Sequence, residues 1–305
     1  MTAELRPATL DDAEAFSALR DVVWPYQVGN AESVRHRWST MPEAARLLML
    51  LAVVDGQVVG AGRAGLNTWT SEAGAAHAMV VVHPEHRRRG IGARLHDAVE
   101  RHLRDVGARR VELWADDDPG IAAWCARLGY ERTHELRFSR LDLSNPDALP
   151  PVPPMPAGVT VTSYTEVGPR VAYEMDVETI VDEPGEMTID SIPYEEWEAG
   201  HWNDVLIDRD ASAVVLVDGR AAAYTVVDAD RATGRMWSGG TGTRREYRGR
   251  GLAKIAKSVA LRRAIALGIT SAYTSNDEVN RPMLAVNEWL GYRACATEWA
   301  NVKTL

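Results

Sequence analysis

A glycine-containing loop that occurs twice constrains the fold of this chain most strongly. The first copy runs from Arg87 to Gly92 and the second from Arg248 to Ala253. Each copy precedes a stretch with helical periodicity, and each stretch leads to a Gly-Tyr pair. The pair lies 39 residues after Gly90 in the first copy and 40 residues after Gly251 in the second. Matching landmarks at matching spacing indicate an internal duplication of about half the chain.

The composition of the loop suits an anionic ligand. Glycines let successive backbone N–H groups turn inward, and a helix that begins there directs its positive dipole end at the same point. Such helix starts bind phosphate or pyrophosphate. Neither copy has the Gly-x-Gly-x-x-Gly pattern of dinucleotide sites or the Gly-Lys-Ser/Thr pattern of triphosphate loops. The sequence therefore predicts at least one site for a phosphorylated cofactor of another kind.

Length and charge narrow the class of protein. A chain of 305 residues accommodates two domains of about 150 residues, and its net charge of −9 disfavours nucleic-acid binding. The longest apolar run, Leu47 to Val54, is far shorter than the roughly 20 residues that cross a membrane, and the start lacks an apolar secretory segment. Cys125 and Cys295 form neither a metal spacing nor a disulfide framework. We expect a cytoplasmic, reduced protein with no membrane, nucleic-acid or metal partner.

Strand and helix signals follow the same order in both halves. In the first half, Asp55-Gly56 joins two apolar runs as a hairpin, and a Val-rich strand over residues 76–83 enters the loop. In the second half, a hairpin at Asp218-Gly219 and a strand over residues 235–243 repeat this order. The helix after each loop has one apolar face. The sequence predicts two α/β domains, each with a mixed sheet flanked by helices.

A proline-rich segment separates the two halves. Six prolines fall within residues 144–158, and so many prolines give a stiff, extended connector. We therefore expect an N-terminal domain over residues 1–143, a linker over residues 144–158 and a C-terminal domain over residues 159–305.

Taken together, these motifs resemble the GNAT superfamily of acyl-CoA-dependent N-acyltransferases in both halves. The resemblance rests on an Arg-x-x-Gly-x-Gly/Ala motif after a Val- or Thr-rich strand, with Gly-Tyr downstream. It covers nearly the whole chain. It implies tandem GNAT-like domains with mostly antiparallel sheets and acetyl-CoA as co-substrate. It also implies direct attack by a primary amine on the thioester after a base removes the proton of the amine.

The resemblance also implies cofactor-binding residues in both halves. Backbone amides of the loop would hold the CoA pyrophosphate, and the preceding strand would pair with the pantetheine arm. In the second half the implied residues are Thr241, Gly242, Thr243, Arg248, Gly249, Arg250, Gly251, Leu252, Ala253, Lys254, Asn276 and Asn280. In the first half they are Val80, Val81, Val82, Arg87, Arg88, Arg89, Gly90, Ile91, Gly92 and Ala93. Asp118 stands at the place of Asn280, and a carboxylate is a poorer neighbour for an anionic cofactor. We therefore expect the chemistry in the C-terminal domain.

The proton donor for the departing thiolate is not defined by the sequence. The family often has a Tyr four residues before the glycine of Gly-Tyr, whereas Cys125 and Asn287 hold those positions here. The alternatives are Tyr273 or Tyr292, water, or one domain that does no chemistry. A packed strand residue is the more common role for a tyrosine at the place of Tyr292.

The general base is also open. His77 could serve the first domain, although a histidine at a surface or core edge is the more common case. In the second domain the candidates are a carboxylate of the acidic segment 174–210 or the terminal carboxylate of Leu305.

The acidic segment suggests the kind of acceptor. Residues 174–210 carry thirteen acidic side chains and one arginine. A negative field raises the local concentration of cations, and Trp faces hold ammonium groups. We expect a small basic amine as acceptor, bound by Glu195, Glu196, Trp197, Glu198 and Trp202. The alternative is a solvated helix face that maintains solubility.

A second class of function fits the absent tyrosines, namely a non-catalytic CoA-binding sensor or interaction module. Turnover with any amine would separate the enzyme from the sensor. The sequence leaves open the acceptor, the acyl chain and whether the protein is a monomer or a homodimer.

Overall fold

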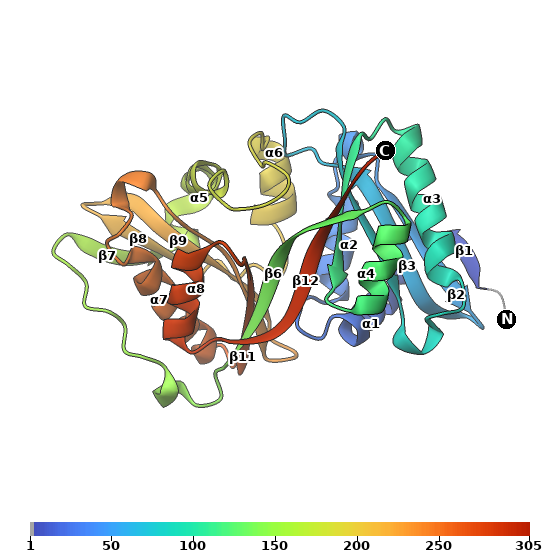
Figure 1. Ribbon diagram of the computed structural model, residues 1–305. Coiled ribbons are helices and arrows are strands. Elements are labelled where there is room, and N and C mark those ends of the chain that lie inside the picture. The colour runs from blue at the N-terminus through green and yellow to red at the C-terminus, as the bar shows by residue number, and fades with distance from the viewer. Residues whose placement is uncertain (1–2) are drawn as a thin grey trace. The chain divides into compact units, whose positions relative to one another are not determined.

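The computed structural model describes residues 3–305, which form two compact units. The first unit holds the described chain up to Glu135, residues 185–192 and Thr297–Leu305. The second unit holds Leu136–Pro184 and Pro193–Ala296. Each unit is a mixed sheet with helices on both faces, which confirms the expected fold class (Figure 1).

The sheet of the first unit follows the chain order. Neighbouring strands pair antiparallel except for the last two, which pair parallel. The tight turn at Asp55 and Gly56, both with positive φ, makes the expected hairpin between the second and third strands. The strands are β1 (Glu4–Pro7), β2 (Leu48–Val54), β3 (Gln57–Leu66), β4 (Ala75–Val82) and β5 (Arg110–Asp116).

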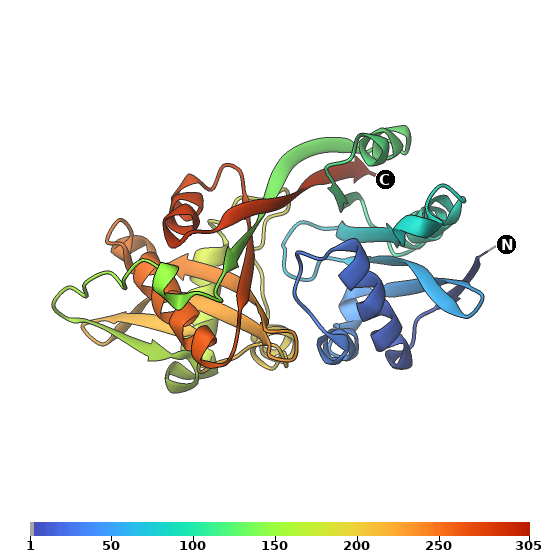
Figure 2. The same cartoon turned by 90° about the horizontal axis from the view of Figure 1, so that it is seen from below.

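Helices cover both faces of this sheet. α1 (Ala13–Val23) and α2 (Ala31–Ser39) pack on one face through a core that includes Phe16 and Leu51. α3 (Ile91–Asp105) and α4 (Pro119–Arg127) pack on the other face, as Figure 2 shows. The apolar face of α3 at helical spacing explains its burial against the sheet.

The second unit repeats this plan. Its own strands pair in chain order, again antiparallel except for a parallel last pair. They are β7 (Val159–Ser163), β8 (Ala213–Val217), β9 (Arg220–Asp230), β10 (Arg235–Thr243) and β11 (Ser271–Asp277). Its helices are α5 (Tyr164–Ile180), α6 (Tyr194–Trp197), α7 (Leu252–Ala266) and α8 (Arg281–Leu290). Short helical turns also occur in both units. They are η1 (Leu10–Asp12), η2 (Glu43–Ala45), η3 (Pro84–His86), η4 (Pro146–Ala148), η5 (Glu198–Trp202) and η6 (Arg245–Tyr247).

The final strand of each sheet comes from the other half of the sequence. In the first unit, β5 pairs with residues 298–304 of β12 (Arg293–Thr304). In the second unit, β11 pairs with residues 136–142 of β6 (Glu131–Asp142). The compact units therefore depart from the expected boundaries at residues 143 and 159. The sequences of β6 and β12 are compatible with strands, but they do not specify which sheet edge each strand will join.

The expected linker has little regular structure. Residues 144–158 contain the single turn η4 and are otherwise outside helices and strands. Leu149 within this segment is buried in the core of the second unit. In the part of the chain that the structure describes, no helix is both long and apolar enough to cross a bilayer.

Candidate functional site

The second glycine loop forms a helix start with open backbone amides. Gly249 and Gly251 both have positive φ (74° and 75°), and α7 begins directly after them. The guanidinium of Arg248 donates through Nε to the carbonyl of Thr243 at 3.0 Å, and it also pairs with Asp182. Because these contacts fix the start of the loop, the N–H groups at the beginning of α7 are held in one place.

The first loop has the same backbone but a different side chain at one position. Arg88 and Gly90 have positive φ (62° and 78°), and Arg87 Nε donates to the Val82 carbonyl at 3.0 Å. Arg88 occupies the place of Gly249, and its guanidinium lies against Gly120 at the start of α4. The first loop therefore has an arginine side chain where the second loop has open space around Gly249.

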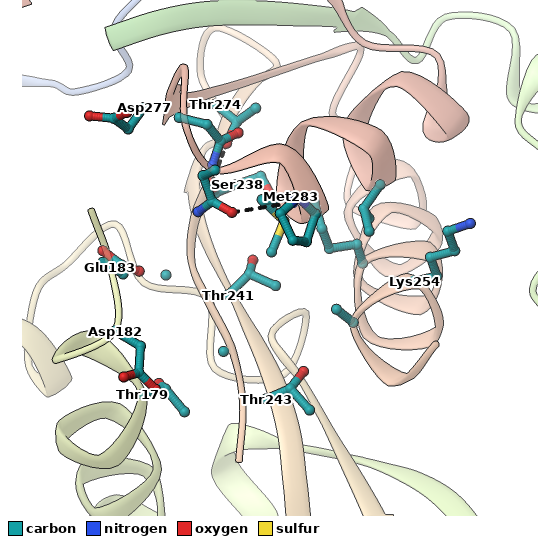
Figure 3. Close-up of a pocket in the computed structure, with 18 of the residues that line it drawn as sticks. Thr179, Asp182, Glu183, Ser238, Thr241, Thr243, Lys254, Thr274, Asp277 and Met283 are labelled. Atoms are coloured by element: carbon teal, nitrogen blue, oxygen red, sulfur yellow. Dashed lines mark hydrogen bonds between the residues drawn. The ribbon is translucent and has the colours of Figure 1, made fainter. Parts of the chain in front are cut away.

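A cavity of about 850 Å³ lies entirely within the second unit. It extends along β10 to the loop and is bounded by α7, β11, α8 and the segment after α5. Figure 3 shows Thr241 and Thr243 of β10, with Lys254 to one side and Asp182 and Glu183 to the other. The cavity brings together these residues of the expected cofactor site: Thr241, Gly242, Thr243, Arg248, Gly249, Gly251, Leu252, Ala253, Lys254, Asn276 and Asn280.

Arg250 is the one expected residue of this half that does not line the cavity. Its guanidinium lies 5.7 Å from the centre of the Tyr247 ring. The expected residues of the first half, from Val80 to Ala93, belong to the first unit and form no part of this cavity.

β10 separates from its parallel neighbour β11 along the cavity. The two strands pair only over residues 235–237 of β10, and the hydroxyl of Thr274 then donates to the Ser238 carbonyl at 3.0 Å. A register shift against β9 falls between Ser238 and Thr241, whereas β4 pairs with β3 without a shift. Beyond the separation, the edge of β10 has backbone groups that can pair with an extended ligand.

A close approach explains one glycine of this strand. A Cβ atom at Gly242 would lie 2.3 Å from Thr179 Oγ1 and 2.6 Å from the Tyr224 ring. Both partners are buried. The end of α5 can therefore approach β10 at this point only because position 242 has no side chain.

Two carboxylates line the cavity next to this contact, and their environments differ. Asp182 forms ion pairs with Arg245 and Arg248, which hold its pKa well below the usual range. Glu183 has its pKa raised to about 7, first because the surrounding protein removes water and then because the charge of Asp176 opposes ionisation. Glu183 is an exposed side chain at the wall of the cavity. A carboxylate with this pKa can accept a proton from an amine near neutral pH.

The expected acceptor residues lie elsewhere. Trp197 is fully buried, and its Nε1 donates to Asp176 Oδ2 at 2.7 Å. Trp202 stacks on Tyr164. None of the five residues expected to bind the acceptor lines the cavity: Glu195, Glu196, Trp197, Glu198 and Trp202. The expectation was wrong for Trp197. A tryptophan has a large apolar surface, and its burial in the core of the second unit is more favourable than its exposure to solvent.

The two tyrosine candidates also lie outside the cavity lining. Tyr292 is 2% exposed and packs in the core of the second unit. Tyr273 contacts the guanidinium groups of Arg140 and Arg235. At the place of the family tyrosine, the side-chain amide of Asn287 donates to Asn276 Oδ1 at 2.6 Å.

The remaining candidates belong to the first unit. His77 Nδ1 lies 3.3 Å from Glu112 Oε2, and the imidazole is exposed while the carboxylate is buried. Cys125 is buried, which raises the pKa of its thiol to about 11. Leu305 packs against the core of the first unit, so its terminal carboxylate is no part of the cavity in the second unit.

Sequence reasoning missed several polar residues of the cavity wall, and two of them stand out. Lys257 and Ser238 line the cavity and are almost fully buried. Lys257 lies six residues after Gly251, and His96 lies six residues after Gly90. The sequence signal for Lys257 was therefore a titratable residue at the same point of both repeats, within an otherwise apolar helix face.

The residues of the cavity fit a CoA-like ligand. Open space surrounds Gly249 and Gly251, and the edge of β10 beyond residue 237 is free to pair. In the described chain, no group of three or more His, Cys, Asp or Glu side chains could hold a metal ion.

Comparison with known proteins identifies the family of this chain. Residues 13–130 match the model of the Acetyltransferase (GNAT) family. A mycothiol acetyltransferase of Clavibacter michiganensis subsp. michiganensis is 30% identical over 257 residues, which cover 82% of this chain and 78% of the relative. A mycothiol acetyltransferase of Actinosynnema mirum is 30% identical over 269 residues, which cover 87% and 85%.

Solved structures share the fold at lower identity. A GCN5-related N-acetyltransferase from Sphaerobacter thermophilus has a TM-score of 0.75 at 18% identity, covering 99% of this chain and 95% of that chain. A tandem GNAT protein from the clavulanic acid biosynthesis pathway has a TM-score of 0.74 at 22% identity, with 99% and 98% covered. The relatives at 30% identity extend over both units, so the chain belongs to the GNAT family of acyl-CoA-dependent N-acetyltransferases.

Proposed function

We propose that the second unit transfers an acetyl group from acetyl-CoA to the primary amine of a small molecule. One observation supports this most directly: a single cavity joins the open amides of the loop, the free edge of β10 and Glu183. Amides of residues 249–254 would hold the pyrophosphate, and β10 would pair with the pantetheine arm. Asn276 and Asn280 lie beside this path, where Asn280 also caps α8 by accepting from Met283 N.

Glu183 is the proposed general base. The acceptor amine must lose a proton before it attacks the thioester, and a base with a pKa near neutrality does this best at neutral pH. Glu183 has that pKa and faces the cavity from the side opposite Lys254 (Figure 3). Backbone N–H groups at the irregular part of β10 would stabilise the oxyanion.

The acceptor is proposed to be a small basic amine. Glu183 and the buried Asp277 place two carboxyl groups on the cavity wall, while Asp182 is paired with two arginines. The curated relatives named mycothiol acetyltransferase add a second candidate, the acceptor of those enzymes.

Two measurements test the proposal. Calorimetry with acetyl-CoA should show binding, and a thiol-release assay over a panel of basic amines and the acceptor of mycothiol acetyltransferases should show turnover. Binding without turnover on any amine would support the non-catalytic sensor instead. An absence of binding would remove the proposal.

A further inference from the structure

A buried polar cluster lies where β10 and β11 separate. Lys257 Nζ donates to Ser238 Oγ at 2.7 Å, and the same ammonium lies 5.6 Å from the centre of the Tyr292 ring. The three residues are 2%, 4% and 2% exposed, respectively. Lys257 and Ser238 line the cavity, whereas Tyr292 is not part of its lining. The cluster therefore has one side toward the proposed cofactor site.

The charge of Lys257 is not balanced by a protein partner. Burial lowers the pKa of Lys257 to about 7, and its hydrogen-bond partner is the hydroxyl of Ser238, not a carboxylate. Lys254, one turn earlier on α7, lies 5.0 Å from the Trp289 ring. Asp277 on β11 accepts from Val279 N. Burial also raises the pKa of Tyr292, so its phenol is neutral at neutral pH.

An unbalanced buried cation destabilises a fold unless an anion joins it. The proposed reaction produces one such anion, the thiolate of CoA. Ser238 lies five positions before Thr243 on β10, and Thr243 lies beside the loop, so the two are about 16 Å apart along an extended strand. An arm that pairs with β10 from the loop onward would bring its sulfur toward Ser238.

We propose that the hydroxyl of Ser238 donates the proton that the departing CoA thiolate takes up, and that Lys257 resupplies this proton. As the carbon–sulfur bond breaks, the sulfur takes the proton of Ser238 Oγ. In the same step Ser238 Oγ takes a proton from Lys257 Nζ, so no serine alkoxide forms, and the lysine is left neutral until it is protonated again from solvent. Ser238 is thus the catalytic residue, and Lys257 acts through it. This inference depends on the proposed function, because it assumes CoA in the cavity.

The first unit offers a contrast at the equivalent place. His96 Nε2 lies 3.2 Å from the hydroxyl of Tyr130, so a titratable residue and a tyrosine meet there as well. However, Glu100 lies 3.6 Å from the same nitrogen, and Lys303 pairs with Glu100. That cluster is already balanced within the protein, and only the second unit leaves a buried cation for an incoming anion.

The test measures the acidity of the CoA thiol while it is bound. CoA is titrated on the wild-type chain, Lys257→Met and Ser238→Ala, with the ultraviolet absorption of the thiolate as readout. Desulfo-CoA, which lacks the sulfur, is the control ligand. We expect the acid dissociation constant of the bound thiol to be about tenfold larger on the wild type than on either variant. Affinity for desulfo-CoA should stay within about twofold, because the loop and β10 are unchanged.

Equal thiol acidity on the wild type and on Ser238→Ala, with desulfo-CoA still bound, would overturn the relay and leave the proposed function intact. If Lys257→Met fails to fold, Ser238→Ala carries this decision alone, since it removes a single oxygen. A wild-type chain that binds neither CoA nor desulfo-CoA would remove the proposed function and the relay together.

Discussion

Trp197 Nε1 donates to Asp176 Oδ2 at 2.7 Å in the core of the second unit. The hydroxyl of Tyr224 donates to the other oxygen of the same carboxylate at 2.6 Å. Two hydrogen bonds compensate a buried carboxylate for the water it has lost, and the loss of one donor leaves one of its oxygens without a partner. This contact explains why an acidic segment holds a fully buried tryptophan.

Trp197→Phe should lower the free energy of unfolding by roughly 2–4 kcal/mol, because Asp176 loses a donor and the smaller ring leaves a void. Urea unfolding measures this change. Glu195→Gln is the control on the same helix and should change stability by less than about 0.5 kcal/mol. A Trp197→Phe protein as stable as the wild type would contradict the structural role.

Gly251→Val should weaken acetyl-CoA binding at least about tenfold, because a β-branched residue at a φ of 75° distorts the amides at the start of α7. Calorimetry measures the affinity. Gly268→Val is the matched control, since Gly268 at the other end of α7 also has a positive φ (86°) and lies outside the cavity lining. Equal affinity losses for the two variants would show a general effect of strain instead.

Glu183→Gln should reduce kcat roughly 10²–10⁴-fold if Glu183 is the general base. In the wild type, kcat/KM should rise with pH up to about 7, because Glu183 must be ionised and its pKa is about 7. This rising limb should disappear in the variant. Glu174→Gln, an exposed carboxyl of the same acidic segment on α5, should keep the wild-type profile. A rising limb that persists in Glu183→Gln would assign the base to another group.

Glu298→Gln should stabilise the protein more at pH 8 than at pH 4. Glu298 is 4% exposed, and burial together with the charge of Asp116 raises its pKa to about 7. Between about 4.5 and about 7, the folded carboxyl holds a proton that the unfolded chain has released, so stability falls as pH rises. The difference between the two pH values should be on the order of 2–3 kcal/mol, measured by urea unfolding. A difference that does not depend on pH would contradict this assignment.

Removal of residues 297–305 should destabilise the first unit, because β5 loses its partner strand and exposes an unpaired edge. Hydrogen exchange at residues 110–116 should become faster. The lining of the cavity ends before residue 297, so acetyl-CoA binding to the second unit should remain. Unchanged exchange in β5 would show that this pairing contributes little to stability.

Most of the fold could be predicted from local sequence patterns. The helix start at Gly251, the hairpin at Asp218 and Gly219, and the strand over residues 235–243 all formed where the sequence predicted them. Each depends on neighbours in the chain: glycine at positive φ, alternation along a strand, or an apolar face at helical spacing. The residues expected around the second loop also meet in one cavity for this reason, because strand, loop and helix follow one another directly.

The sequence by itself thus determined the duplicated α/β plan and the position of the loop that begins α7. Only the tertiary structure decided that β12 completes the first sheet, that Trp197 is a core residue, and that Glu183 and Lys257 face the cavity with pKa values near 7. Strand partners, burial and desolvation depend on groups distant in the chain, and neither residue type nor spacing specifies which distant groups will meet.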